Sequence, residues 1–135
     1  MMNVFQVDGA YLIDLPGYGY ARASHAERSA FRGLLTHVLR RERLGGVVWL
    51  LDLRRTLSVE DRAMQDALAE RGTRVLATFT KADKLARGER LERERALRAE
   101  LGLPDDQCVL TSARTGDGMT ELREAIAGLV EVKEA

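Results

Sequence analysis

A chain of 135 residues, of which 45% are hydrophobic, is long enough to bury the core of one domain. Lysine plus arginine and aspartate plus glutamate each number 21, so no charge imbalance points to nucleic acid or a membrane surface. The one cysteine, Cys108, excludes an internal disulfide framework and suits a reducing compartment. Because no apolar run is long enough to span a bilayer, and no signal-peptide pattern opens the chain, we expect a soluble cytoplasmic protein.

The first third of the chain predicts a β hairpin followed by a helix. Short apolar segments flank Asp8-Gly9, a favoured two-residue hairpin turn. Ser24 and Glu27 form a candidate capping box, which predicts that a helix begins there. Over residues 24–43 apolar side chains recur at helical spacing: Phe31, Leu34, Leu35, Val38 and Leu39.

The middle of the chain predicts two strands separated by a helix. The continuous apolar run over residues 47–51 is typical of a strand that is buried on both faces. Residues 58–71 predict an amphipathic helix, and Gly72 is a suitable stop for it. Residues 75–79 are again continuously apolar or small and predict a second buried strand.

The last third continues the alternation of helix and strand. Residues 109–110 predict a short strand, and residues 122–130 predict a terminal helix. Between the second buried strand and the short one, residues 88–101 are highly charged and predict a surface helix anchored by three leucines: Leu91, Leu97 and Leu101. After the opening hairpin, the alternation predicts an α/β sheet with helices on both faces.

Three short motifs each follow a predicted strand: Asp14-Leu15-Pro16-Gly17, Thr80-Lys81-Ala82-Asp83 and Ser112-Ala113. Ligands of open parallel sheets bind at the carboxyl ends of strands, where these motifs are expected. In the first motif, the carboxylate can hold a water of a bound Mg²⁺, and the glycine lets a backbone N–H approach a terminal phosphate. The alternative is a glycine-rich turn whose aspartate caps a neighbouring N–H.

The second motif carries the more selective chemistry. The carboxylate of Asp83 can accept two parallel hydrogen bonds from the N1 and N2 donors of guanine, which adenine does not supply. The stem of Lys81 can lie along the base, and a backbone N–H of Ser112-Ala113 can donate to the guanine O6. The alternatives are that Lys81, Asp83 and Lys84 are solvated charges and that Ser112-Ala113 is a turn with a helix cap.

Residues 14–21, Asp-Leu-Pro-Gly-Tyr-Gly-Tyr-Ala, resemble the hallmark of the EngB family. The members of this family are bacterial GTPases of the Era-like translation-factor class. The resemblance continues through residues 47–54, 80–89 and 112–118. It implies a three-layer sheet of the P-loop NTPase kind, as in small GTPases. It also implies binding of GTP or GDP with Mg²⁺, and GTP hydrolysis that assists assembly of the large ribosomal subunit and normal cell division and septation.

Carried to this sequence, the resemblance implies that Asp14 contacts Mg²⁺ through water and that Gly17 contacts the γ-phosphate. Residues 17–24 would form a mobile switch that includes Tyr18 and Gly19. Tyr18 stands where many small GTPases place a water-orienting glutamine, so we expect slow intrinsic hydrolysis. The base would be bound by five residues: Thr80, Lys81, Asp83, Ser112 and Ala113.

The family's leading strand, its Gly-x-x-x-x-Gly-Lys-Ser loop, first helix and first switch are absent from the sequence. That loop and switch supply the phosphate cradle and the direct Mg²⁺ ligands. We therefore expect residues 1–135 to be a single, N-terminally truncated EngB-type G domain, with negligible GTP affinity by itself. A gene model truncated at Met1-Met2 is the simplest explanation, and a degenerate paralogue is the alternative.

The absent strand would lie between the hairpin strand that ends at Asp14 and the strand of residues 47–51. Either these two strands pair directly, or their edges are left open and the isolated chain folds poorly.

Two functional hypotheses follow. The first is a monomeric GTPase that acts on the large ribosomal subunit precursor or its ribosomal RNA, with no membrane partner. The second is a scaffold that binds the ribosome or RNA without turnover, for which a basic patch would serve: Arg40, Arg41, Arg43, Arg54 and Arg55. We expect His25 and His37 to be surface or capping residues, and Cys108 to pack in or beside a strand without activation.

Overall fold

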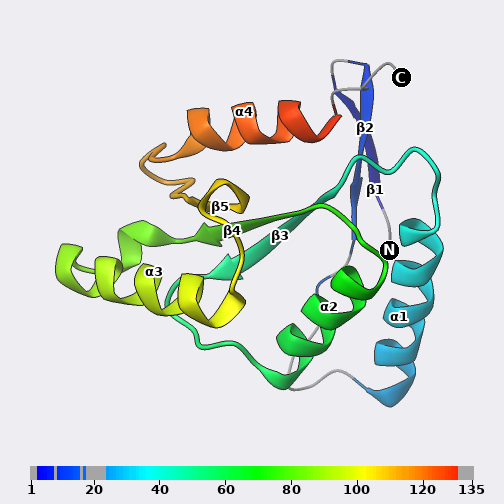
Figure 1. Cartoon of the computed structure of the whole chain (residues 1–135), viewed down its shortest axis with the longest axis horizontal. Helices are drawn as coiled ribbons and strands as arrows, with labels where there is room; N and C mark the ends of the chain where they lie inside the picture. The colour runs from blue at the N-terminus through cyan, green and yellow to red at the C-terminus, as the bar shows by residue number, and fades with distance from the viewer. Residues whose placement is uncertain (1–2, 8, 16, 18–23, 131–135) are drawn as a thin grey trace. The chain divides into compact units, whose positions relative to one another are not determined.

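The structure is a computed structural model that describes residues 3–7, 9–15, 17 and 24–130 (Figure 1). Its elements, in chain order, are β1 (Asn3–Val7), β2 (Ala10–Asp14), α1 (His25–Leu39), β3 (Val47–Asp52), α2 (Val59–Glu70), β4 (Val75–Thr80), η1 (Ala82–Lys84), α3 (Arg87–Leu101), η2 (Asp105–Gln107), β5 (Cys108–Leu110) and α4 (Met119–Val130). They group into two compact units, which we call the hairpin unit (Met1–Leu44 and Ser58–Ala67) and the sheet unit (Gly45–Leu57 and Leu68–Ala135). Each is described by itself.

The hairpin unit opens with the predicted β hairpin. Strands β1 and β2 pair antiparallel, with Val4 opposite Ile13 and Phe5 opposite Leu12. Gly9 has φ +81°, the left-handed conformation that a two-residue hairpin turn requires, and Asp8 lies outside the described residues. The hairpin prediction is thus confirmed.

Helix α1 begins where the sequence predicts and ends earlier. The hydroxyl of Ser24 accepts a hydrogen bond from the Glu27 N–H at 3.1 Å, which confirms Ser24 as the N-cap. The helix ends at Leu39, short of the predicted residue 43. The residues that follow are mostly arginines without an apolar stripe, so a further turn would bury little surface. His25 and His37 are exposed on this helix, as expected.

Helix α2 has a reciprocal cap that satisfies two backbone donors. The Ser58 N–H donates to the Asp61 carboxylate at 2.8 Å, and the Asp61 N–H donates to the Ser58 hydroxyl at 3.0 Å. At the other end, Gly72 adopts φ +65° and its N–H donates to the Ala69 carbonyl, which confirms the predicted stop.

The sheet unit is built on three parallel strands in the order β3-β4-β5. Helices α3 and α4 lie on opposite sides of this sheet, as the alternating pattern predicts (Figure 1). Strand β4 stands in the centre, and its residues 76–79 are all buried. Cys108 is buried in β5, where desolvation raises the pKa of its thiol, so it forms part of the core as expected.

Strand β3 corrects the prediction of a strand buried on both faces. Trp49 and Leu51 are buried, but Leu50 between them points to the other face and is 63% exposed. Among the described residues β3 is paired only with β4, and β2 belongs to a separate two-stranded sheet. Direct pairing of β2 with β3 is therefore not found. A run of apolar residues makes a strand, but burial of both faces requires a covering layer on each.

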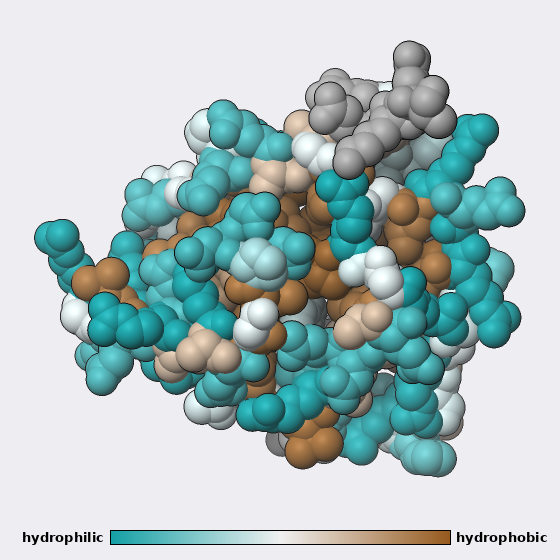
Figure 2. Space-filling model, viewed as in Figure 1, coloured by the Kyte–Doolittle hydropathy of each residue, from teal (hydrophilic) through white to brown (hydrophobic). Residues whose placement is uncertain are grey.

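Helix α3 also differs from its prediction in one anchor. Leu97 and Leu101 are buried, whereas Leu91 is 52% exposed. The Arg98 guanidinium lies 5.9 Å from the centre of the Phe79 ring and covers part of the core instead. In the space-filling view hydrophilic residues predominate, with hydrophobic residues visible between them (Figure 2).

Candidate functional site

The loops that leave β4 and β5 meet at one edge of the parallel sheet. Parallel strands present their carboxyl ends at the same edge, and ligands of such sheets bind there. The Ala82 N–H donates to the Thr111 carbonyl at 3.1 Å, which ties the turn η1 to the end of β5. This contact brings two sequence motifs, Thr80-Lys81-Ala82-Asp83 and Ser112-Ala113, side by side.

Asp83 is held in that cluster by Ser112. The fully buried Ser112 hydroxyl donates to Oδ1 of Asp83 at 2.7 Å and accepts from the Thr115 N–H at 3.2 Å. This hydrogen bond, with smaller contributions from the charges of Lys84 and Arg114, lowers the pKa of the Asp83 carboxyl. Its other oxygen, Oδ2, is buried and has no hydrogen-bond partner in the described part of the chain. Asp83 therefore offers an ionised acceptor that still lacks a donor.

The loop after β5 is shaped by backbone hydrogen bonds and one glycine. The Ser112 N–H donates to the Asp117 carbonyl at 3.0 Å, and the Gly116 N–H donates to the Ser112 carbonyl at 2.8 Å. Gly118 has φ +73°, and a Cβ there would overlap the Leu110 carbonyl oxygen. Ala113 lies exposed in this loop, and its N–H takes part in no hydrogen bond among the described residues. It is a backbone donor available to a ligand.

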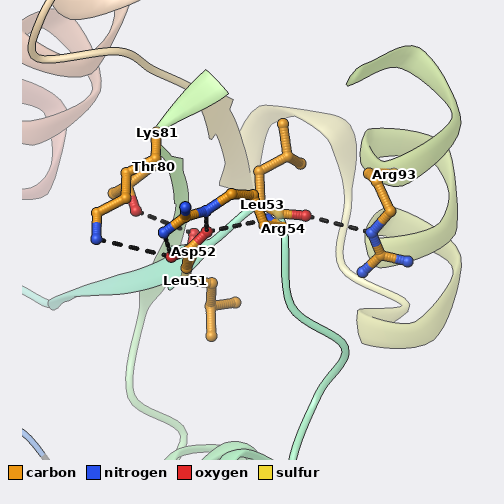
Figure 3. Close-up of polar contacts among 7 residues, drawn as sticks. All are labelled: Leu51, Asp52, Leu53, Arg54, Thr80, Lys81 and Arg93. Atoms are coloured by element: carbon orange, nitrogen blue, oxygen red, sulfur yellow. Dashed lines mark hydrogen bonds and ion pairs between the residues drawn. The ribbon is translucent and has the colours of Figure 1, made fainter. Parts of the chain in front are cut away.

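Lys81 has an unusual backbone conformation. Its φ of 62° and ψ of 34° are left-handed, a region that costs a residue with a side chain about 1 kcal/mol or more. Its Nζ lies 3.7 Å from Oδ2 of Asp52, at the end of the neighbouring strand (Figure 3). Thr80 points elsewhere: its hydroxyl lies 3.4 Å from the Leu51 carbonyl and links β4 to β3. Strain at Lys81 is consistent with a functional turn.

Asp52 and Arg93 are parts of this edge that sequence reasoning missed. Asp52 accepts hydrogen bonds from the backbone N–H, Nε and Nη2 of Arg54 at 3.0, 3.1 and 2.8 Å (Figure 3). These bonds lower the pKa of Asp52 to about 2. Arg93 of α3 donates to the carbonyls of Leu53 and Arg55 at 3.2 and 2.8 Å. The sequence signal for Asp52 was its position at the end of a predicted strand, two residues before Arg54.

The two aspartates of this edge share an electrostatic environment. The pKa of Arg54 is raised chiefly by its hydrogen bond to Asp52 and further by the charge of Asp83. The Arg54 guanidinium is therefore close enough to be influenced by both carboxylates.

The other predicted site residues lie in the hairpin unit. Asp14 is the exposed last residue of β2, and Gly17 is exposed beyond it. Tyr18 and Gly19 lie outside the described residues. The structure brings together Thr80, Lys81, Asp83, Ser112 and Ala113 within the sheet unit. Asp14 and Gly17 belong to the other unit, so their part in this site stays a prediction. The basic patch likewise draws on both units, so it stays a prediction.

Two further findings concern the described residues alone. They contain no group of three or more His, Cys, Asp or Glu side chains that could hold a metal ion. Within the same residues, every helix is too short or too polar to cross a membrane.

The parallel sheet, with its Lys-x-Asp turn joined to a Ser-Ala loop at the carboxyl ends of adjacent strands, defines an α/β protein with a P-loop NTPase-like fold. In agreement, a crystal structure described as a probable GTP-binding protein engB matches this chain with a TM-score of 0.79. The match covers 96% of this chain and 83% of the other at 17% sequence identity, so it shows the fold. No family model matches the chain.

Curated relatives show the family. Each of the following is named a probable GTP-binding protein EngB. The relative from Syntrophomonas wolfei is 41% identical over 124 residues, which cover 91% of this chain and 64% of the relative. The one from Syntrophus aciditrophicus is 41% identical over 93% of this chain and 65% of the relative. The one from Desulfitobacterium hafniense is 35% identical over 98% and 67%. The chain belongs to the EngB family and spans about two thirds of the length of these relatives.

Proposed function

We propose that the sheet unit binds the base of a guanine nucleotide, as the nucleotide-recognising part of an EngB-type GTP-binding protein. The observation that carries this proposal is the Asp83 carboxylate, which is oriented by Ser112 and has one buried oxygen without a donor. Buried polar atoms in proteins almost always have a partner, so a ligand N–H is a suitable one. Family membership supports guanine as the source of that N–H.

The chemistry of the base explains the selectivity. Guanine presents two adjacent donors, N1–H and the N2 amino group, to an ionised carboxylate, while adenine offers no such pair. The Asp83 carboxyl is ionised and acceptor-only at neutral pH, and its lowered pKa extends the ionised form to more acidic solution. In the same proposal, the Lys81 stem lies along the base and the Ala113 N–H donates to the guanine O6. Thr80 and Ser112 shape the loops that hold these groups.

The residues that the structure describes do not form a magnesium site. Asp14 is exposed and single, and the described residues hold no cluster of candidate ligands. The sequence also contains no Gly-x-x-x-x-Gly-Lys run that could cradle phosphates. We therefore derive no hydrolytic step. Contacts of Asp14 with Mg²⁺ through water and of Gly17 with the γ-phosphate stay proposals for a polypeptide that also carries a phosphate loop.

Family membership supports a wider proposal for the whole protein. It would hydrolyse GTP as a cytoplasmic monomer, in support of large ribosomal subunit assembly and normal division and septation. Its partner would be the large-subunit precursor or its ribosomal RNA. A non-hydrolysing ribosome- or RNA-binding scaffold is the second candidate, favoured by the exposed Arg54 and Arg55 beside the base site.

The base-binding proposal is tested by titrating the ¹⁵N-labelled chain with GDP and with ADP. We expect weak binding of GDP, with shifts in the amide resonances of residues 80–84 and 112–118, and no matching shifts with ADP. Micromolar affinity is not expected, because the phosphates supply most of the binding energy and their loop is absent from the sequence. Equal responses to GDP and ADP would contradict guanine recognition.

The variant Asp83→Asn tests the role of the carboxylate. It should weaken GDP binding by about ten-fold or more and favour xanthosine diphosphate, because the amide offers a donor where xanthine has a carbonyl. Asp106→Asn, an exposed aspartate of η2, is the matched control and should bind GDP as the unmodified chain does. Unchanged selectivity in Asp83→Asn would remove this residue from the base site.

A further inference from the structure

A chain of polar contacts links α3 to the end of β3 and then to Lys81 in the base site (Figure 3). We propose that Asp52 is a positioning residue for base recognition, which holds the ammonium of Lys81 while Arg54 and Arg93 hold Asp52 in place. This inference rests on the proposed function, because Lys81 is its point of contact with the base. The proposed base site then includes residues of β3 and α3 in addition to the two loop motifs that follow β4 and β5.

The first step is the placement of Asp52. The parallel register sets Asp52 opposite Thr80, so its carboxylate stands beside the residue that follows β4. The Asp52 side chain is only 16% exposed, and three hydrogen bonds from Arg54 fix its orientation. A carboxylate held this way presents a fixed negative charge at the edge of the site.

The second step is the bracing of that strand end. Leu53 is fully buried, and its N–H donates to the Thr80 carbonyl at 3.0 Å, which continues the contact between β3 and β4. Arg93 donates to the carbonyls of Leu53 and Arg55, the residues on either side of Arg54. A side chain from α3 thus clamps the backbone from which Arg54 reaches Asp52.

The third step is the effect on Lys81. Its left-handed backbone is set by the turn, because the Ala82 N–H bonds to Thr111 and the Lys84 N–H bonds to the Lys81 carbonyl. Its long side chain is 56% exposed and would otherwise sample many rotamers. Attraction to Asp52 at 3.7 Å reduces that freedom before a ligand arrives, which is the usual advantage of a preorganised site.

The contact can be tested without any ligand. The sequence has three lysines, so the side-chain ammonium resonances of ¹⁵N-lysine-labelled protein are readily assigned. We expect Asp52→Asn to shift the Lys81 ammonium signal while leaving that of Lys84 in place. Asp106→Asn should shift neither. An unmoved Lys81 signal in a folded Asp52→Asn variant would overturn the proposal, whether or not the chain binds guanine nucleotides.

The link to the base is tested by a double-mutant cycle on GDP binding. Asp52→Asn should weaken binding about two- to five-fold, as expected for a partly exposed ion pair. Lys81→Met should weaken it at least as much, and adding Asp52→Asn to Lys81→Met should cause no further loss. If the double variant instead loses GDP affinity by the product of the two single-variant factors, Asp52 acts independently of Lys81 and the proposal is overturned.

If Asp52→Asn fails to fold, the contact is tested in Lys81→Met instead. A shift of the Asp52 carboxyl ¹³C resonance in that variant supports the contact, and no shift overturns it.

Discussion

Asp52 contributes to stability in addition to its proposed role of positioning Lys81. Its folded pKa of about 2 lies below the ordinary 3.8, chiefly because Arg54 donates to it. Hydrogen bonds favour the charged form, so the folded state binds this proton less readily than the unfolded chain does. The resulting stabilisation is complete above about pH 4 and is lost as the pH falls through about 2.

We expect Asp52→Asn to lower the free energy of unfolding by about 1–2 kcal/mol at pH 7, allowing for solvent screening at the half-exposed Arg54. The difference from the unmodified chain should shrink as the pH falls from 4 towards 2. Urea unfolding at several pH values measures this. Asp106→Asn removes an exposed carboxylate and should change stability little at any of them. A constant deficit across the range would argue against the ionised pair.

Ser112 also has two tasks, because its hydroxyl both donates and accepts a hydrogen bond. Ser112→Ala removes the donor to Asp83 and the acceptor for the Thr115 N–H in a fully buried position. We expect a loss of about 1–3 kcal/mol in unfolding free energy. The pKa of Asp83 should rise towards its ordinary value, so the ionised form would be lost at a higher pH as the solution is acidified.

Carboxyl ¹³C spectra of Asp83 recorded during an acid titration measure that change. Ser29→Ala, on the exposed face of α1, is the matched control and should leave both the stability and the Asp83 titration in place. An unchanged Asp83 pKa in Ser112→Ala would show that another group orients the carboxylate.

At the scale of the elements, the loop between β5 and α4 has little room for a side chain at Gly118. Gly118 has a positive φ and also packs against the Leu110 carbonyl, whereas Gly72 after α2 has a positive φ with open space around it. Alanine at Gly72 would therefore meet only the cost of a left-handed backbone, whereas alanine at Gly118 would also meet steric overlap.

Gly72→Ala should cost about 1–2 kcal/mol in unfolding free energy, the price of a left-handed residue with a side chain. Gly118→Ala should cost more than about 3 kcal/mol, because the backbone of the loop must also move away from the new Cβ. Thermal or urea unfolding compares them. Similar losses in the two variants would indicate that the loop after β5 shifts freely, which would argue against a rigid wall for the proposed base site.

At the scale of the whole molecule, the two units differ in how much each buries. Among the described residues, the hairpin unit buries the apolar side chains of Leu35, Val38 and Met64, and the sheet unit buries far more. In the hairpin itself, four large apolar side chains are about half exposed or more: Val4, Phe5, Tyr11 and Leu12. Isolated two-stranded hairpins are marginally stable in water, so local opening should be easiest there.

Hydrogen exchange followed by mass spectrometry tests this difference. Amides of β4 should be protected about 100-fold or more over those of β2, since local openings span free energies from near zero to the global value. Leu76→Ala, in the centre of the sheet, should raise exchange across β3, β4 and β5 while the hairpin, already fast, changes little. Equal protection in β2 and β4 would mean that the hairpin is stabilised by contacts beyond its own ladder.

Local sequence signals predicted the elements because they act over a few residues. Ser24 capped its helix, Asp8-Gly9 predicted a turn that the conformation of Gly9 confirms, and Gly72 ended α2. Burial was harder to predict, because it depends on what covers each face. The run at residues 47–51 is uniformly apolar, yet Leu50 is exposed; Leu91 fits the helical pattern and is exposed as well.

The sequence by itself determined the alternation of strand and helix, the order of the motifs and the family, because each is written in short runs of residues. Only the tertiary structure decided which distant residues work together. Asp83 and Ser112 are 29 positions apart, as are Asp52 and Lys81, and the parallel register of β3, β4 and β5 brings each pair to one edge. Local patterns along the chain do not show which strands become neighbours, because that is decided when the strands and helices pack around one core.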